Sequence, residues 1–179
     1  MPNMQSQNPR RQARASPRGF TLVEIMIVVT ILGIIGAIVL PKFSDASLLA
    51  RTNTLKDDLR YLRTQIVVFK AQHHDVPPGY PGGDMTAAPS AADYLAQMTS
   101  ATDEKCNIGV VSAAFRFGPY LSKMPPNPIN GLDTVIVVGN GAALPAPDGS
   151  TGWILKPQTQ ELIANLTGTD TDGVHYADY

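Results

Sequence analysis

The longest apolar run in the sequence covers residues 20–40, and the rest of the chain is organised around it. Its 21 residues are apolar or small except for Thr21, Thr30 and one charged residue, Glu24. As an α-helix with a rise of about 1.5 Å per residue, the run is roughly 30 Å long, which is the thickness of the hydrocarbon core of a bilayer. The pattern predicts a single membrane-spanning helix.

A second helical pattern follows in residues 41–75. Apolar residues recur there at spacings of seven, four, three, four and three, while charged residues take the positions between them. This period predicts an amphipathic helix whose apolar face packs on a globular domain and whose charged face meets solvent or neighbouring chains. The predicted apolar face consists of Leu48, Leu55, Leu59, Leu62, Ile66 and Phe69.

The remaining segments predict a small sheet. Residues 76–131 form a connection rich in Pro and Gly, with one short helix at 91–98 that Ser90 caps. Residues 133–138 are a strand by their β-branched content, and residues 153–166 form a hairpin in which Trp153 anchors the core. We therefore expect an α+β fold, with one long N-terminal helix packed on a small antiparallel sheet at 132–167, followed by an Asp- and Gly-rich tail at 168–179.

Charge is distributed unevenly about the apolar run. Residues 1–18 carry four arginines and no acidic residue, whereas residues 41–179 carry ten Lys and Arg against fourteen Asp and Glu. This asymmetry predicts an N-terminus in the cytoplasm and a C-terminal domain on the outer side of the membrane. No basic patch follows the span in the sequence, so we expect no nucleic-acid partner.

Glu24 is the unusual residue of the apolar run. An ionised carboxylate in the lipid core costs on the order of 3 kcal/mol and needs a partner, and the run contains no basic residue. Cleavage between Gly19 and Phe20 would create a cationic α-amino group one helical turn from Glu24. That amine, or the amine of a neighbouring copy, is the predicted partner.

The stretch Arg18-Gly19-Phe20-Thr21-Leu22-Val23-Glu24, followed by an unbroken apolar helix, resembles the processing motif of type IV pilins and of type II secretion pseudopilins. The resemblance implies that a prepilin peptidase removes residues 1–19 and methylates Phe20. It also implies that Glu24 neutralises the terminal amine of an adjacent subunit in a helical filament. A proline at the position of Pro41 is common in the family, so we expect the helix to continue through Pro41, bent or locally loosened.

The resemblance implies a structural subunit without catalytic activity. Its implied partners are other copies or other pilins, the prepilin peptidase, and an inner-membrane assembly platform with its ATPase. The sequence lacks a phosphate-binding loop, a Gly-x-Ser-x-Gly elbow and a His-Glu-x-x-His motif, which also favours a protein that is not an enzyme. Many pilins have a C-terminal disulfide, and because Cys106 is the single cysteine, a major pseudopilin of type II secretion is the favoured branch.

Two alternatives to this branch remain open. The chain could be a type IV pilin for adhesion, motility or DNA uptake, or a signal-anchored periplasmic domain that never polymerises.

The tail offers a candidate calcium site, because Asp170, Asp172 and the following Gly173 suit a hard cation and major pseudopilins hold calcium in C-terminal loops. The competing interpretation is a solvated polar tail. We expect Cys106 to be a small buried side chain, and no other cofactor is predicted.

Overall fold

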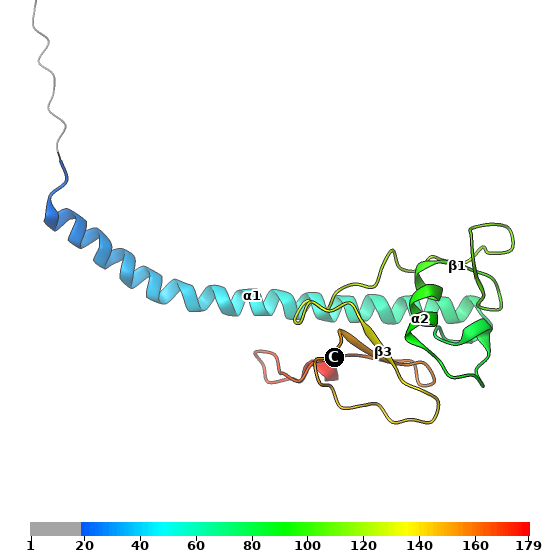
Figure 1. Ribbon diagram of the computed structural model, residues 1–179. Coiled ribbons are helices and arrows are strands. Elements are labelled where there is room, and N and C mark those ends of the chain that lie inside the picture. Colours follow the sequence, from blue (N-terminus) through cyan, green and yellow to red (C-terminus); the bar gives the residue numbers. More distant parts are fainter. Residues whose placement is uncertain (1–18) are drawn as a thin grey trace, which may run out of the picture. The chain divides into compact units, whose positions relative to one another are not determined.

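The computed structural model describes residues 19–179, apart from the side chains of residues 40, 41, 44 and 45. The chain divides into two compact units, one ending at Lys42 and the other covering Phe43–Tyr179. Helix α1 (Leu22–Gln72) contributes to both units (Figure 1). The predicted helix therefore continues past the position of Pro41.

The first unit is the apolar part of α1. Leu22–Val39 is long and apolar enough to cross a membrane, with a mean hydropathy of 2.8, and none of it is buried. The exposed side chains lie all around this part of the helix, because Val28, Val29, Ile34 and Ile35 are each at least half exposed. A helix that is apolar on every side requires lipid or other helices around it.

The second unit is built around the later turns of α1. The predicted apolar face is confirmed, since Leu55, Leu59, Leu62, Ile66 and Phe69 are at most 2% exposed. They share one core with side chains from the sheet, including Trp153, Leu155 and Leu162. Trp153 is fully buried, as predicted, and its indole N–H donates to the Pro125 carbonyl oxygen at 3.0 Å. Leu48 is only half-buried at the start of this face.

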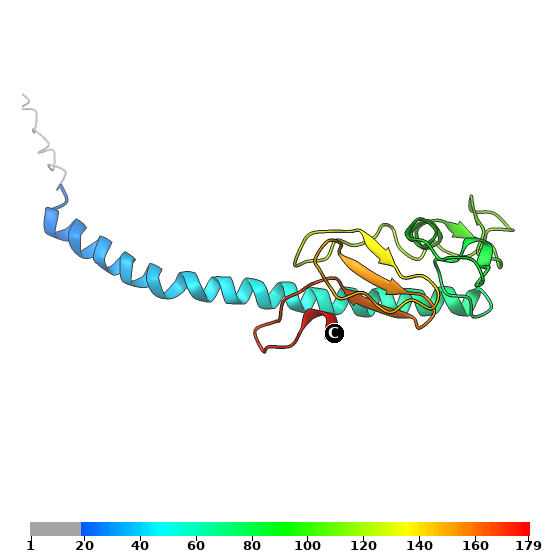
Figure 2. The same cartoon turned by 60° about the horizontal axis from the view of Figure 1, so that its bottom comes forward.

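The sheet has three strands in the order β3-β4-β5, namely β3 (Val135–Val137), β4 (Trp153–Lys156) and β5 (Glu161–Ala164). Strands β4 and β5 form the predicted antiparallel hairpin, and the sheet lies against α1 (Figure 2). Strands β3 and β4 are parallel, although the sequence predicted antiparallel pairing throughout. The connection at 138–152 is long enough to return the chain to the end of the sheet where β3 begins, and parallel pairing requires such a crossover.

The connecting region contains more structure than predicted. Besides helix α2 (Ala91–Thr99) it contains a 3-10 turn, η1 (Pro81–Gly83), and a two-stranded ladder of β1 (Ala101–Thr102) and β2 (Ile108–Gly109). The predicted cap of α2 is confirmed, because the Ser90 hydroxyl accepts the Asp93 amide at 3.0 Å. A second 3-10 turn, η2 (Tyr176–Asp178), closes the tail. Strands of two residues carry no periodic signal that a sequence pattern could reveal.

His73 joins the end of α1 to the connecting region. It contacts the last helical turn, where its Nδ1 lies 2.7 Å from the Phe69 carbonyl oxygen. It is also fully buried, stacked on the Phe69 ring at 3.9 Å, with Nε2 3.0 Å from the Thr102 hydroxyl. Burial lowers the pKa of His73 below its ordinary value. The burial was not predicted, because adjacent histidines at a helix end give no indication of which one turns inward.

Candidate functional site at the N-terminal end of helix α1

The residues before α1 form a reciprocal cap. The Thr21 amide donates to Glu24 Oε2 at 3.0 Å, and the Thr21 hydroxyl donates to the same oxygen at 3.2 Å. In return, the Glu24 amide donates to the Thr21 hydroxyl oxygen at 3.2 Å. This is a capping box, which satisfies amides that the first turn of a helix leaves without carbonyl partners.

The cap gives Glu24 a partner that the sequence analysis missed. The carboxylate is stabilised within its own chain before any cleavage, and the positive end of the helix dipole adds to this. Both hydrogen bonds that it accepts in the described residues use Oε2, so Oε1 is left for another donor. The signal that could have revealed the cap is the spacing Thr-x-x-Glu ahead of an apolar run.

The predicted cleavage site lies just outside the helix. Gly19 and Phe20 precede the first residue of α1, and the Phe20 side chain is 81% exposed. A Cβ added at Gly19 would meet no atom within 4 Å. Among the described residues, the Gly19–Phe20 peptide bond therefore lies outside the helix and is uncovered. The arginines of residues 1–18 lie outside the described residues.

The tail places the two predicted calcium ligands in different environments. Asp170 is buried, and its Oδ1 accepts the amides of Asp172 and Val174 at 2.8 and 2.9 Å. Its Oδ2 accepts the Tyr179 hydroxyl and lies 3.8 Å from Lys56 Nζ. The Tyr179 hydrogen bond, the amides and Lys56 together hold the pKa of Asp170 below its ordinary value.

Asp172 lies two residues further along and is exposed. Within residues 19–179, no group of three or more His, Cys, Asp or Glu side chains is close enough to hold a metal ion. The contacts of Asp170 therefore tie the tail to helix α1 without a metal. Calcium binding by Asp170 and Asp172 stays a prediction.

Cys106 and the neighbouring residues Asp57 and Asp58 are three further groups whose chemistry the structure describes. Cys106 is buried, as predicted, and burial raises the pKa of its thiol to about 11, so it is a poor nucleophile at neutral pH. The two neighbouring carboxylates of α1, Asp57 and Asp58, have different surroundings. Asp57 forms an exposed ion pair with Arg60, with 3.3 Å between the two side chains. The pKa of Asp58 is raised by partial burial and then by Asp57.

Comparison with known proteins agrees with this geometry. The family described as "Prokaryotic N-terminal methylation motif" matches residues 14–40, which include the capping box. The type IV major pilin protein PilA of Myxococcus xanthus is 26% identical over 174 residues, which are 87% of this chain and 71% of that protein. The N-terminal motif and this alignment support a member of the type IV pilin and pseudopilin family. Members of this family are structural filament subunits and not enzymes.

Two further members of the family align over shorter stretches. The type II secretion system core protein G of Pseudomonas aeruginosa is 34% identical over 64 residues, which are 36% of this chain and 45% of that protein. The fimbrial protein EcpB of Eikenella corrodens is 37% identical over 67 residues, 37% of this chain and 42% of that protein. No solved structure matches the chain significantly. The motif and the apolar helix fit a pilus subunit that is anchored in the inner membrane.

Proposed function

We propose that this chain is a prepilin that is cut between Gly19 and Phe20, methylated at Phe20, and polymerised through α1 into a type IV pilus. Before assembly, the C-terminal domain stands in the periplasm and the apolar part of α1 stays in the inner membrane. The partners are other copies, a prepilin peptidase, and an inner-membrane platform with its ATPase. The observation that carries the proposal is the capped Glu24 at the start of an uncovered apolar helix.

The capping box supports polymerisation because it leaves one carboxylate oxygen accessible. A carboxylate among apolar helices needs a cationic partner, and a single cap does not neutralise its charge. The α-amino group of Phe20 from a neighbouring copy would approach Oε1 while Thr21 keeps Oε2. Charge-assisted contacts of this type fix register between otherwise uniform apolar helices.

The alignments favour a pilus over a secretion filament. The alignment with the Myxococcus xanthus pilin extends over 87% of the chain, whereas the alignment with the secretion protein extends over 36%. A pseudopilin of type II secretion is the second candidate, and the observation in its favour is the single cysteine, which permits no intrachain disulfide. Deleting the gene distinguishes the two: loss of surface filaments indicates a pilus, and periplasmic retention of exported enzymes indicates secretion.

The assembly step is tested by Glu24→Gln, which keeps the shape of the side chain and removes its charge. We expect the amount of filament sheared from cells to fall by about tenfold or more, because each subunit loses one charge-assisted contact. The amount of the protein in the membrane should be unchanged. Thr21→Ser preserves the hydroxyl of the cap and serves as the matched control. N-terminal sequencing of the wild-type chain must give Phe20, because an intact residue 1 in assembled material rules out the processing step.

A further inference from the structure

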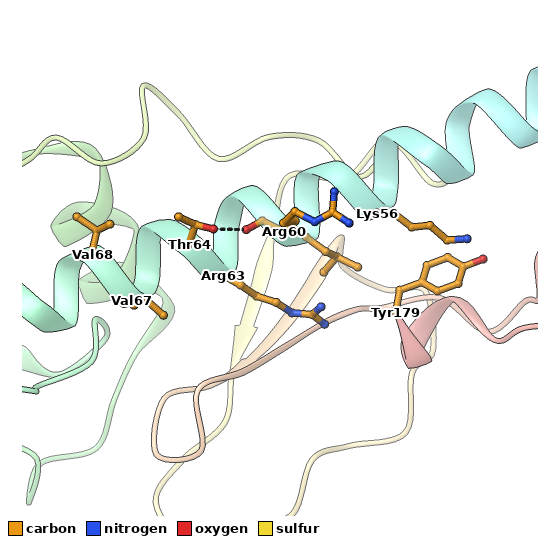
Figure 3. A pocket seen from close by; sticks show the side chains of 8 residues that line it. Lys56, Arg60, Arg63, Thr64, Val67, Val68 and Tyr179 are labelled. Carbon is orange, nitrogen blue, oxygen red and sulfur yellow. Dashed lines mark hydrogen bonds between the residues drawn. The ribbon is translucent and has the colours of Figure 1, made fainter.

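An open groove runs along the face of α1 in the second unit, with a volume of about 520 Å³. Lys56, Arg60 and Arg63 lie along it, and Val67 and Val68 continue the same side of the helix (Figure 3). Neither Asp nor Glu is among the residues that line the groove; the rest of its lining is Leu59, Thr64 and Tyr179. We call this surface the α1 groove.

Within the described residues the positive charge of the α1 groove is compensated in part: Lys56 Nζ lies 3.8 Å from buried Asp170, whereas the two arginines have weaker partners. Arg63 directs Nε and Nη2 at the Leu162 carbonyl oxygen, a neutral acceptor. Within the part of the chain that the structure describes, Arg60 pairs only with Asp57, and both side chains are at least 75% exposed, so solvent screens this pair. At the other end of the groove, Val67 and Val68 are 56% and 37% exposed. The groove therefore suits a segment that presents an acidic and an apolar side chain together.

The chain has such a segment at Leu132-Asp133. Leu132 is 36% exposed, Asp133 is exposed, and within the described residues the Asp133 carboxylate takes part in no hydrogen bond or ion pair. The segment is also preformed, because Asn130 Oδ1 accepts the Leu132 amide at 3.1 Å and Asn130 Nδ2 donates to the Thr151 carbonyl oxygen at 2.9 Å. A rigid segment binds with less loss of conformational freedom than a mobile one.

Two other segments place an acidic residue near an exposed apolar residue, but they fit the α1 groove less well. The Asp84 carboxylate, next to exposed Met85, already accepts the amide and hydroxyl of Thr86. Asp172 and Val174 belong to the tail whose Tyr179 forms part of the α1 groove itself. Among these segments, Leu132-Asp133 presents a carboxylate without partners in the described residues, and it lies on a different element from the groove.

We propose that the α1 groove of one copy receives the Leu132-Asp133 segment of a second copy, with Asp133 facing Arg60 and Leu132 on Val67 and Val68. The contact joins two different patches of the same chain, and contacts of that kind produce open helical polymers when the rotation does not close. This contact presupposes the filament proposed above and identifies a site on the globular domains that sets their packing.

Cross-linking in filaments of the full chain tests the contact. Val67→Cys combined with Leu132→Cys should give disulfide-linked multimers after mild oxidation of sheared filaments. The matched control is Val67→Cys with Val110→Cys, since Val110 is 86% exposed but lies outside the proposed contact. Native Cys106 is buried and contributes little background. A control pair that links as well as the test pair contradicts the contact.

Charge reversal supplies the second measurement. Arg60→Glu and Asp133→Arg should each lower the yield of sheared filaments by about tenfold, because like charges then oppose each other across the interface. The double variant should recover most of the wild-type yield. Normal filament yields in both single variants, or single losses that the double variant does not repair, overturn the proposal. A wild-type chain that makes no filaments at all contradicts the proposed function instead.

Discussion

The Arg63 guanidinium donates two hydrogen bonds to one acceptor, the Leu162 carbonyl oxygen, at 3.2 Å from Nε and 2.8 Å from Nη2. This pair fastens α1 to β5 at the edge of the sheet. The amphipathic period placed Arg63 on the charged, outward side of the helix. The long side chain of Arg63 instead turns back over β5, and Arg63 is half-buried for this reason.

We expect Arg63→Ala to lower the free energy of unfolding by about 1.5–3 kcal/mol, because a carbonyl that two charged donors satisfied loses both of them. Arg60→Ala, on the same helix but 80% exposed at its side chain, should change the free energy by less than about 0.5 kcal/mol. Chemical denaturation of the full chain in detergent measures both variants. Equal effects of the two substitutions contradict the role assigned to Leu162.

His73 should make stability depend on pH. Its pKa is lowered in the folded chain, chiefly by burial, so the unfolded chain binds more protons once the pH falls below the ordinary value of about 6.5. Stability is therefore complete above that pH and is lost as the pH falls toward the folded-state pKa. Thermal unfolding between about pH 7.5 and pH 5 measures the loss. His73→Phe should flatten the profile below pH 6.5, whereas exposed His74→Gln should leave it unchanged.

Gly152 should not tolerate a side chain. A Cβ at this position would lie 2.0 Å from the Leu132 carbonyl oxygen, which is backbone and cannot move aside. Gly152→Ala should cost about 1–3 kcal/mol or more of stability, as overpacking does elsewhere. Gly139→Ala, where a Cβ meets nothing within 4 Å, is the matched control. Comparable melting temperatures for the two variants contradict the close approach of Gly152 to the Leu132 carbonyl group.

Calcium binding by the tail can be separated from its structural contacts. Asp170→Asn disturbs the contacts with Lys56 and Tyr179 whether or not calcium binds, so exposed Asp172 is the informative position. If the prediction holds, millimolar calcium raises the melting temperature over that in EDTA, since a ligand bound only by the folded state stabilises it. Asp172→Asn should abolish this rise without changing the melting temperature in EDTA. Identical melting of the wild-type chain in both solutions ends the calcium hypothesis.

The sequence predicted the elements whose signals are local. The apolar period of α1, the Ser90 cap and the hairpin at 153–166 depend on residues close together in the chain, and the structure confirms each of them. The cleavage motif was also visible, because a carboxylate at a fixed place in an apolar run is rare. Sequence patterns of this kind report faces and turns reliably.

Contacts between distant segments could not be predicted. Strand direction in β3 depends on the course of the 138–152 connection, which contains no periodic signal. The burial of His73, the turn of Arg63 toward Leu162 and the tie between Asp170 and Lys56 each join residues at least 29 positions apart. Such pairs depend on tertiary packing, and a single sequence does not specify them.

The uncovered apolar surface of Leu22–Val39 determines where free subunits can accumulate. A helix without a polar side has no stable place in water, so an unassembled chain is confined to the bilayer, and the supply of subunits scales with membrane area and not with cell volume. Confinement to a plane also raises the frequency with which two copies meet and restricts their relative orientation. Growth of the filament would then draw on a two-dimensional pool that empties locally around each point of assembly.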